Sequence, residues 1–129
     1  MTSEDISGFQ KLLEEAERDY RNAQSEIDFC EKKQQDILHD MELVEHRYHE
    51  IAHLGVELTD IRRRRRAAKN TMDTLSPLLK WKQENSSALN RLQITIGQMR
   101  KVEDKQQHQV YYRRVDGEDK GTIIGHRDA

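Results

Sequence analysis

Four histidines in the first half of the chain are the side chains best suited to metal chemistry. His39, His46 and His53 recur every seven residues, and His49 lies four residues before His53. Residues four apart share one face of a helix, which makes His46, His49 and His53 weak candidates for a metal site. His39, His46 and His53 fall at the outermost heptad position, however, and this is typical of a solvated face. We therefore expect no metal or other cofactor, and a response to pH near histidine's titration range is a minor alternative.

The densest charged run is Arg62–Arg66, which Lys69 extends. Five consecutive helical residues point all around the helix axis, so one of them must face the apolar stripe. If the phase through Leu58 and Ile61 holds, Arg65 takes this position and can reach a carboxylate of the first helix, such as Asp40, Glu45 or Glu50. In this interpretation the arginines neutralise an acidic helix, and the alternative is a surface that contacts nucleic-acid phosphates. The candidate residues for binding a partner or nucleic acid, including a tyrosine-arginine cluster near the C-terminus, are Arg62, Arg63, Arg64, Arg66, Lys69, Tyr111, Tyr112, Arg113 and Arg114.

The sequence contains no pattern that specifies a reaction. It has no glycine-rich phosphate loop, no nucleophile elbow and no second cysteine for a metal cluster. Hydrophobic residues make up 34% of the chain and charged residues 36%, a composition that suits long helices better than a core enclosing a pocket. We therefore expect a protein that is not an enzyme.

A seven-residue repeat in the first 51 residues is the element that must position these side chains. Apolar residues recur at alternating spacings of three and four, interrupted only by Gln34, and such a repeat predicts a coiled-coil seam on a helix roughly 70 Å long. Small residues at Ala16, Ala23 and Cys30 also fall on the stripe. The large residues predicted to form the seam are Ile6, Phe9, Leu13, Tyr20, Ile27, Ile37, Met41, Val44, Tyr48 and Ile51.

The ends of the helices are predicted from residues that favour caps and turns. Ser3 is a plausible N-cap, and Gly55 is the expected C-terminal stop of the first helix. Thr59 or Asp60 would cap the next helix, although a continuous helix through Gly55 keeps nearly the same apolar spacing. We favour the turn at Gly55 because the sign of the charge reverses there.

Two further breaks are expected in the second half of the chain. Pro77 suits a helix start, with Ser76 as its cap, and residues 85–87 (Asn-Ser-Ser) form another candidate break. Near the C-terminus, residues 110–115 and 122–125 have the composition of two short strands around a turn. A frayed tail is the alternative for this segment.

Charge and cysteine usage indicate how the halves of the chain associate. Residues 1–54 carry a net charge of −8 and residues 55–129 carry +6, which predicts that the two parts pack against each other. Cys30 is the only cysteine, so an internal disulfide is impossible and a reducing compartment is expected. The absence of a long apolar run and of a signal-peptide pattern predicts a cytoplasmic protein without a membrane span.

These observations predict an all-α fold, an elongated antiparallel helical hairpin or coiled coil with a broken return arm and a short β-like C-terminal appendage. The predicted domains are a coiled-coil helical domain (1–107) and a β-hairpin-like tail (108–129). Within the first, helix 1 spans about 3–54 and the return arm about 59–107. We expect a non-catalytic interaction protein, such as an adaptor, assembly factor or inhibitor, that binds a protein partner and forms a homodimer. The alternative is a regulator that binds nucleic acid through Arg62–Arg66 and the C-terminal cluster.

Overall fold

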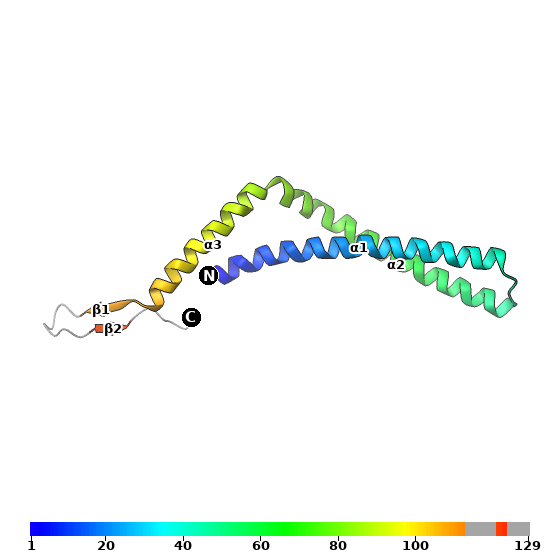
Figure 1. Ribbon diagram of the computed structural model, residues 1–129, viewed down its shortest axis with the longest axis horizontal. Coiled ribbons are helices and arrows are strands. Elements are labelled where there is room, and N and C mark those ends of the chain that lie inside the picture. Colours follow the sequence, from blue (N-terminus) through cyan, green and yellow to red (C-terminus); the bar gives the residue numbers. More distant parts are fainter. Residues whose placement is uncertain (113–120, 124–129) are drawn as a thin grey trace. The chain divides into compact units, whose positions relative to one another are not determined.

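The computed structural model describes residues 1–112 and 121–123 (Figure 1). In chain order these residues form α1 (Ser3–Leu43), α2 (Tyr48–Glu84), α3 (Ser86–Gln107), β1 (Val110–Tyr112) and β2 (Gly121–Ile123). The two strands pair antiparallel, with Tyr111 opposite Thr122. Helices account for most of the described chain, and the predicted all-α class is confirmed.

The chain divides into two compact units. One unit combines residues 1–11 with everything from Asn85 onward, and the other consists of residues 12–84. Helix α1 therefore contributes its first turns to one unit and the remainder to the other.

In the unit formed by residues 12–84, α1 and α2 run in opposite directions. Glu17 pairs with Lys82, Glu31 with Arg65 and Lys33 with Glu57, so that early residues of α1 meet late residues of α2. The core consists of three buried side chains, Cys30, Ile37 and Ile61, with the partly buried Met41, Leu54 and Leu58 packed against them. Burial of these apolar groups, at roughly 25 cal/mol per Å², is the main force that holds the two helices together.

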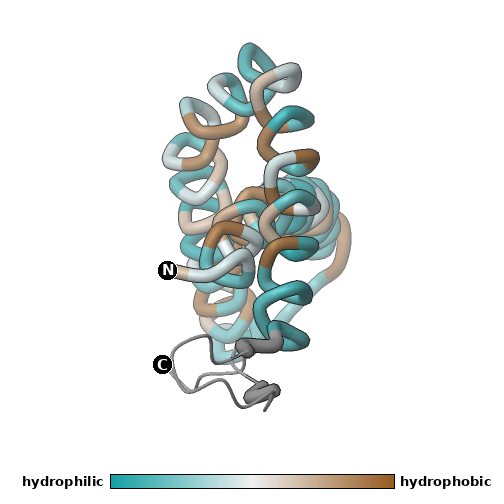
Figure 2. The backbone as a smooth tube through the Cα atoms, turned by 90° about the vertical axis from the view of Figure 1, so that its left-hand side faces the viewer, coloured by the Kyte–Doolittle hydropathy of each residue, from teal (hydrophilic) through white to brown (hydrophobic). Residues whose placement is uncertain are grey.

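The buried positions follow the predicted heptad spacing. On α1, Ala16, Ala23, Cys30 and Ile37 are buried at intervals of seven residues, and on α2 so are Ile61 and Ala68. Between these positions the helices carry polar residues, which Figure 2 shows as alternating brown and teal segments along each tube. The narrow apolar stripe leaves most of each helix surface to solvent.

The predicted end of the first helix is wrong. Helix α1 ends at Leu43 rather than near residue 54, and α2 begins at Tyr48 rather than near 59, so Gly55 lies inside α2. Leu54 and Leu58 pack against the core only if the helix continues through Gly55, and their burial outweighs a glycine penalty of about 1 kcal/mol. Thr59 does not cap a helix, because its hydroxyl donates to the Gly55 carbonyl at 3.0 Å within α2.

The two candidate breaks of the second half have different outcomes. Pro77 lies within α2, and the Ser76 hydroxyl donates to the Met72 carbonyl at 2.9 Å instead of capping a new helix. The break occurs at Asn85, between α2 and α3, where the Leu89 amide donates to the Asn85 carbonyl at 2.9 Å. A proline in a helix removes one backbone hydrogen bond, a loss that α2 tolerates on an exposed face.

In the unit formed by residues 1–11 and 85 onward, the start of α1 is tied to α3. The amide of Ser3 donates to the Glu103 carboxylate at 3.1 Å, and the Ser3 hydroxyl also donates to it. Gln10 donates to the Leu89 carbonyl at 3.3 Å, and Ile96 is the buried apolar residue of α3. Ser3 thus meets the late part of α3, and Gln10, further along α1, meets its early part, so the two segments run in opposite directions.

The predicted N-cap of α1, Ser3, is wrong, because α1 begins at Ser3 and the capping residue is Thr2. The Thr2 carbonyl accepts from the Asp5 amide at 3.1 Å, while the Asp5 carboxylate accepts from the Thr2 amide at 2.8 Å. This reciprocal arrangement resembles a capping box. It leaves the side chain of Ser3 free to be buried against α3.

Candidate functional site

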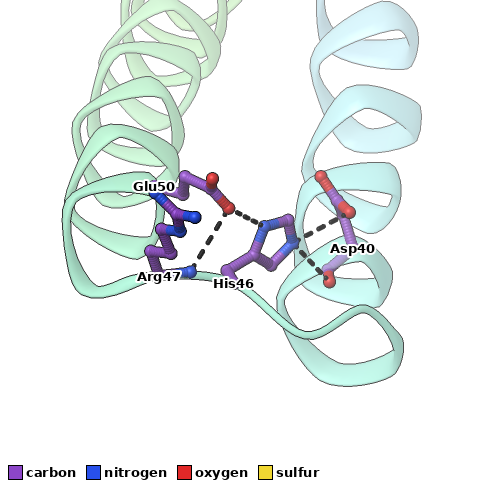
Figure 3. A network of polar contacts seen from close by, with 4 residues as sticks. All are labelled: Asp40, His46, Arg47 and Glu50. Carbon is purple, nitrogen blue, oxygen red and sulfur yellow. Dashed lines mark hydrogen bonds and ion pairs between the residues drawn. The ribbon is translucent and has the colours of Figure 1, made fainter.

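The connection between α1 and α2, residues 44–47, is built around one histidine. Nδ1 of His46 lies 3.1 Å from Glu50 Oε2, and Nε2 lies 3.1 Å from Asp40 Oδ1 and 3.2 Å from the Asp40 carbonyl oxygen (Figure 3). Only 13% of the imidazole side chain is exposed. His46 therefore joins the last turn of α1 to the first turn of α2, and we refer to His46, Asp40 and Glu50 as the histidine clip.

Backbone groups on both sides of the clip use the same partners. The Val44 amide donates to the Asp40 carbonyl at 3.2 Å, and the amides of Glu50 and Ile51 donate to the Arg47 carbonyl at 3.0 and 3.1 Å. The Glu50 carboxylate also accepts from the Arg47 amide at 3.3 Å. The clip thus satisfies polar groups at the two helix ends, which otherwise lack partners.

The clip favours the protonated form of His46. Its pKa is raised, chiefly because the Glu50 carboxylate accepts a hydrogen bond from the ring. Partial burial opposes this effect, while hydrogen bonds to the side chain and backbone of Asp40, together with the Asp40 charge, reinforce it. The C-terminal end of α1 also favours a cation, whereas the N-terminal end of α2 favours the anionic Glu50 in its first turn.

Four apolar side chains around this connection are exposed, and we call them the turn surface: Leu43, Val44, Tyr48 and Ile51. Tyr48 is 90% exposed and Leu43 is 76% exposed. Val44, Tyr48 and Ile51 were predicted to lie in the helical seam. They do not, because the chain turns at residues 44–47 and the α1–α2 seam ends near Met41 and Leu54.

The other predicted seam residues lie on α1 with graded exposure. Leu13 and Ile37 are buried, Phe9 is exposed, and the rest are partly buried, namely Ile6, Tyr20, Ile27 and Met41. Ile37 packs in the core with Ile61 of α2. Whether any of them also forms an oligomer seam stays a prediction.

The arginine run divides into two groups. Arg64 lies 2.6 Å from Glu26 and above the ring of Phe29, while Arg65 lies 3.1 Å from Glu31. Arg65 occupies the position facing α1 that was expected of it, although Glu31 is its partner rather than Asp40, Glu45 or Glu50. These two arginines hold α2 to the acidic helix α1.

The second group of arginines points away from α1. Arg62, Arg63 and Arg66 are exposed and form no ion pair or hydrogen bond with another described residue, and Lys69 is partly buried. In the C-terminal cluster, Tyr111 and Tyr112 belong to β1. Arg113 and Arg114 lie outside the described residues.

Three of the four histidines lie around one hollow near the start of α2. His46, His49 and His53 line an open hollow of about 370 Å³ with Glu50 and Leu54, but His46 is already bonded to two carboxylates. Within residues 1–112 and 121–123, no group of three or more metal-binding side chains is arranged to hold an ion.

Sequence reasoning missed the histidine clip. The spacing of four between His46 and Glu50 was the available signal, but it was assigned to the outer face of a continuous helix. The connection contains no glycine, proline, asparagine or serine, so no residue that favours turns marks it.

Comparison with known proteins adds no functional information. No protein-family model, curated protein or solved structure matches this chain. In the described part of the chain, no helix has an apolar stretch long enough to cross a membrane.

Proposed function

We propose that this protein is a non-catalytic interaction protein that docks its turn surface onto a partner protein. The observation that carries the proposal is the exposure of Leu43, Val44, Tyr48 and Ile51 within nine residues of one another. Single exposed apolar residues are ordinary, but a group of them with polar surroundings is typical of an interaction site. Exposed tyrosine is also among the residues that contribute most to binding energy.

The charges around the turn surface suggest the chemistry of the partner. Residues 40–51 contain four carboxylates, Asp40, Glu42, Glu45 and Glu50, against a single arginine, Arg47. A partner with an apolar groove and a basic rim would complement both the side chains and the charge. Four exposed apolar side chains are too few for the 20 to 30 residues per side of a stable interface, so a second copy of this surface is a poorer match than a groove that encloses it.

We also propose that the protein is an elongated antiparallel hairpin, that it is cytoplasmic and that it is not an enzyme. A hairpin whose arms are held by α1–α2 and α1–α3 contacts would present its connection as an exposed end. Support comes from the antiparallel ion pairs of one unit and the Ser3–Glu103 contact of the other.

Site-specific photo-crosslinking tests the proposed docking. A photoreactive phenylalanine analogue at Tyr48 should crosslink to a partner, which is then purified and its affinity measured by calorimetry. Replacing Leu43 and Tyr48 by serine should weaken binding by about tenfold or more, because these side chains would fill the partner's groove. Both side chains are exposed, so circular dichroism should show an unchanged fold.

Ile94→Ser is the control, because Ile94 is also a largely exposed apolar residue (64%) but lies on α3. It should leave the affinity unchanged. The proposal is wrong if the Tyr48 position crosslinks to no protein, or if the purified partner binds the double variant as tightly as the wild type.

A second candidate function is binding of nucleic acid, and the exposed arginines favour it. Arg62, Arg63 and Arg66 are not used to neutralise α1, and residues three and four apart lie on one helix face. If all three contact phosphates, replacing them by glutamine should reduce the slope of log affinity against log salt by about three units. Fluorescence anisotropy with a DNA duplex and a single-stranded RNA would measure this slope, and equal slopes for variant and wild type would exclude the three arginines.

A further inference from the structure

Both ring nitrogens of His46 face atoms that can only accept hydrogen bonds. Glu50 Oε2 lies opposite Nδ1, while Asp40 Oδ1 and the Asp40 carbonyl oxygen lie opposite Nε2. Figure 3 shows the imidazole between the two helices with these acceptors on its opposite sides. The three distances, 3.1 to 3.2 Å, are those of well-formed hydrogen bonds.

Only the imidazolium can satisfy this arrangement. A neutral imidazole carries one N–H group and presents a lone pair at its other nitrogen. That lone pair would face a carboxylate oxygen, either of Asp40 or of Glu50, at hydrogen-bonding distance. Loss of the proton therefore replaces one of the two ties with a repulsive contact.

The charged groups around His46 come from every segment that meets at this turn. Helix α1 contributes Asp40, and α2 contributes Glu50 with His49 and His53, which line the same hollow. Glu45 and Arg47 flank His46 in the connection. Of these groups, the carboxylates of Asp40 and Glu50 are the ones in hydrogen-bonding contact with the ring, and their negative charge favours the imidazolium.

We propose that His46 is a proton-operated clip that fixes the turn surface: the imidazolium ties α1 to α2, and loss of its proton releases one tie. The inference rests on the proposed docking function, because it describes how that site is regulated. With the clip closed, Leu43, Val44, Tyr48 and Ile51 are held on two fixed helix ends, and a preorganised surface binds more tightly. With the clip open, the first turn of α2 frays.

The direction of the pH effect follows from the raised pKa of His46. The clip contributes its full stabilisation below the unfolded value, about 6.5. This contribution is lost as the pH rises through the higher pKa of the folded protein. The turn is therefore ordered below about pH 6.5 and loosens as the pH rises through the raised pKa of folded His46.

Nuclear magnetic resonance on the full chain tests the clip without any partner. Imidazole ¹⁵N shifts should show both nitrogens of His46 protonated at low pH, with a higher midpoint than in the urea-unfolded chain. Amide hydrogen exchange at Val44, Glu50 and Ile51, corrected for its intrinsic pH dependence, should accelerate several-fold when that midpoint is crossed.

Two variants separate a proton-operated clip from a simple packing role. His46→Gln should abolish the pH dependence of exchange at these amides, and Asp40→Asn should lower the midpoint of His46 because it removes one carboxylate charge. His49→Gln is the matched control, since His49 is exposed and is not one of the hydrogen-bonding partners of the clip. This variant should behave as wild type. All samples contain a chelator, so that metal binding cannot mimic the effect.

The clip is disproved if the midpoint of His46 equals its unfolded value, or if the exchange of His46→Gln keeps the pH dependence of the wild type. Either result would leave the docking proposal intact, because crosslinking at Tyr48 does not depend on the clip. Conversely, failure to find a partner would leave the titration of His46 unaffected. The two proposals therefore fail separately.

Discussion

At the scale of single residues, buried polar contacts explain features that composition alone does not. Ser3 is 5% exposed, although serine is ordinarily a surface residue. Its burial is permitted because Glu103 accepts hydrogen bonds from both its amide and its hydroxyl. A carboxylate at the start of α1 also complements the positive end of the helix dipole.

The first prediction concerns Glu103. Hydrogen bonds from the Ser3 side chain and backbone lower the pKa of Glu103, so this carboxylate stabilises the fold above its unfolded pKa and loses that effect as the pH falls through the folded value. Glu103→Gln should lower the melting temperature at neutral pH, and the difference from wild type should shrink under acidic conditions. Thermal melts followed by circular dichroism at several pH values measure this, and Glu84→Gln, on the exposed end of α2, is the control.

The second prediction concerns the thiol of Cys30. Its side chain is 0% exposed, and burial, followed by the nearby Glu26 charge, raises its pKa. Since the thiolate is the reactive form, a thiol reagent should modify the folded protein at least about tenfold more slowly than the urea-unfolded protein. Equal rates in the two states would mean that Cys30 is accessible, and a disulfide-linked dimer would then be feasible.

At the scale of elements, the position of the turn separates the predicted from the observed structure. Helix content, the heptad stripe and the inward position of Arg65 were all evident from periodicity, because a pattern repeated over several turns leaves little ambiguity. The position of the turn was not evident, because the spacing of Ile51, Leu54 and Leu58 is compatible both with a continuous helix and with a turn at Gly55. Gly55 offered the stronger local signal, and only the packing of Leu54 and Leu58 overrides it.

The candidate site was therefore predictable only in part. The pairing of α1 carboxylates with α2 arginines followed from charge. The histidine clip required the true position of the turn, which depends on contacts between residues of different helices. The C-terminal cluster was recognised by composition, and Arg113 and Arg114 lie outside the residues that the structure describes.

The third prediction tests the turn directly. Gly55 lies inside α2, and a methyl group at its Cα would meet no atom within 4 Å. Gly55→Ala should therefore raise the free energy of unfolding by about 1 kcal/mol, measured by urea denaturation. Had Gly55 been the left-handed residue ending a helix, the same change would destabilise the protein. Gly97→Ala, at an equally open position inside α3, should have a similar stabilising effect.

At the scale of the whole molecule, exposed apolar residues outside the turn surface bear on self-association. Leu12, at the edge of the predicted seam, is 62% exposed, and Val56 on α2 is 61% exposed. The sequence predicts a homodimer, and association would cover exposed apolar side chains of this kind. The homodimer remains a proposal that is independent of docking at the turn.

The fourth prediction is that the mass in solution depends on concentration. Light scattering should show a mass that rises towards twice the 15.3 kDa of one chain, because association covers apolar side chains left exposed along α1. Leu12→Glu should return the protein to a single chain, whereas the exposed polar position Gln24, changed to Glu, should not. A constant mass of one chain at all concentrations would refute the homodimer.

The distribution of charge between α1 and α2 has a practical consequence. In three of the ion pairs between them, Glu17–Lys82, Glu26–Arg64 and Glu31–Arg65, the acid belongs to α1 and the base to α2. Two copies of α1 would place carboxylates against carboxylates, which disfavours that pairing. If the connection were cut between Val44 and Arg47, the two fragments should prefer each other to themselves. The protein would then serve as a split reporter whose halves reassemble when they are brought together.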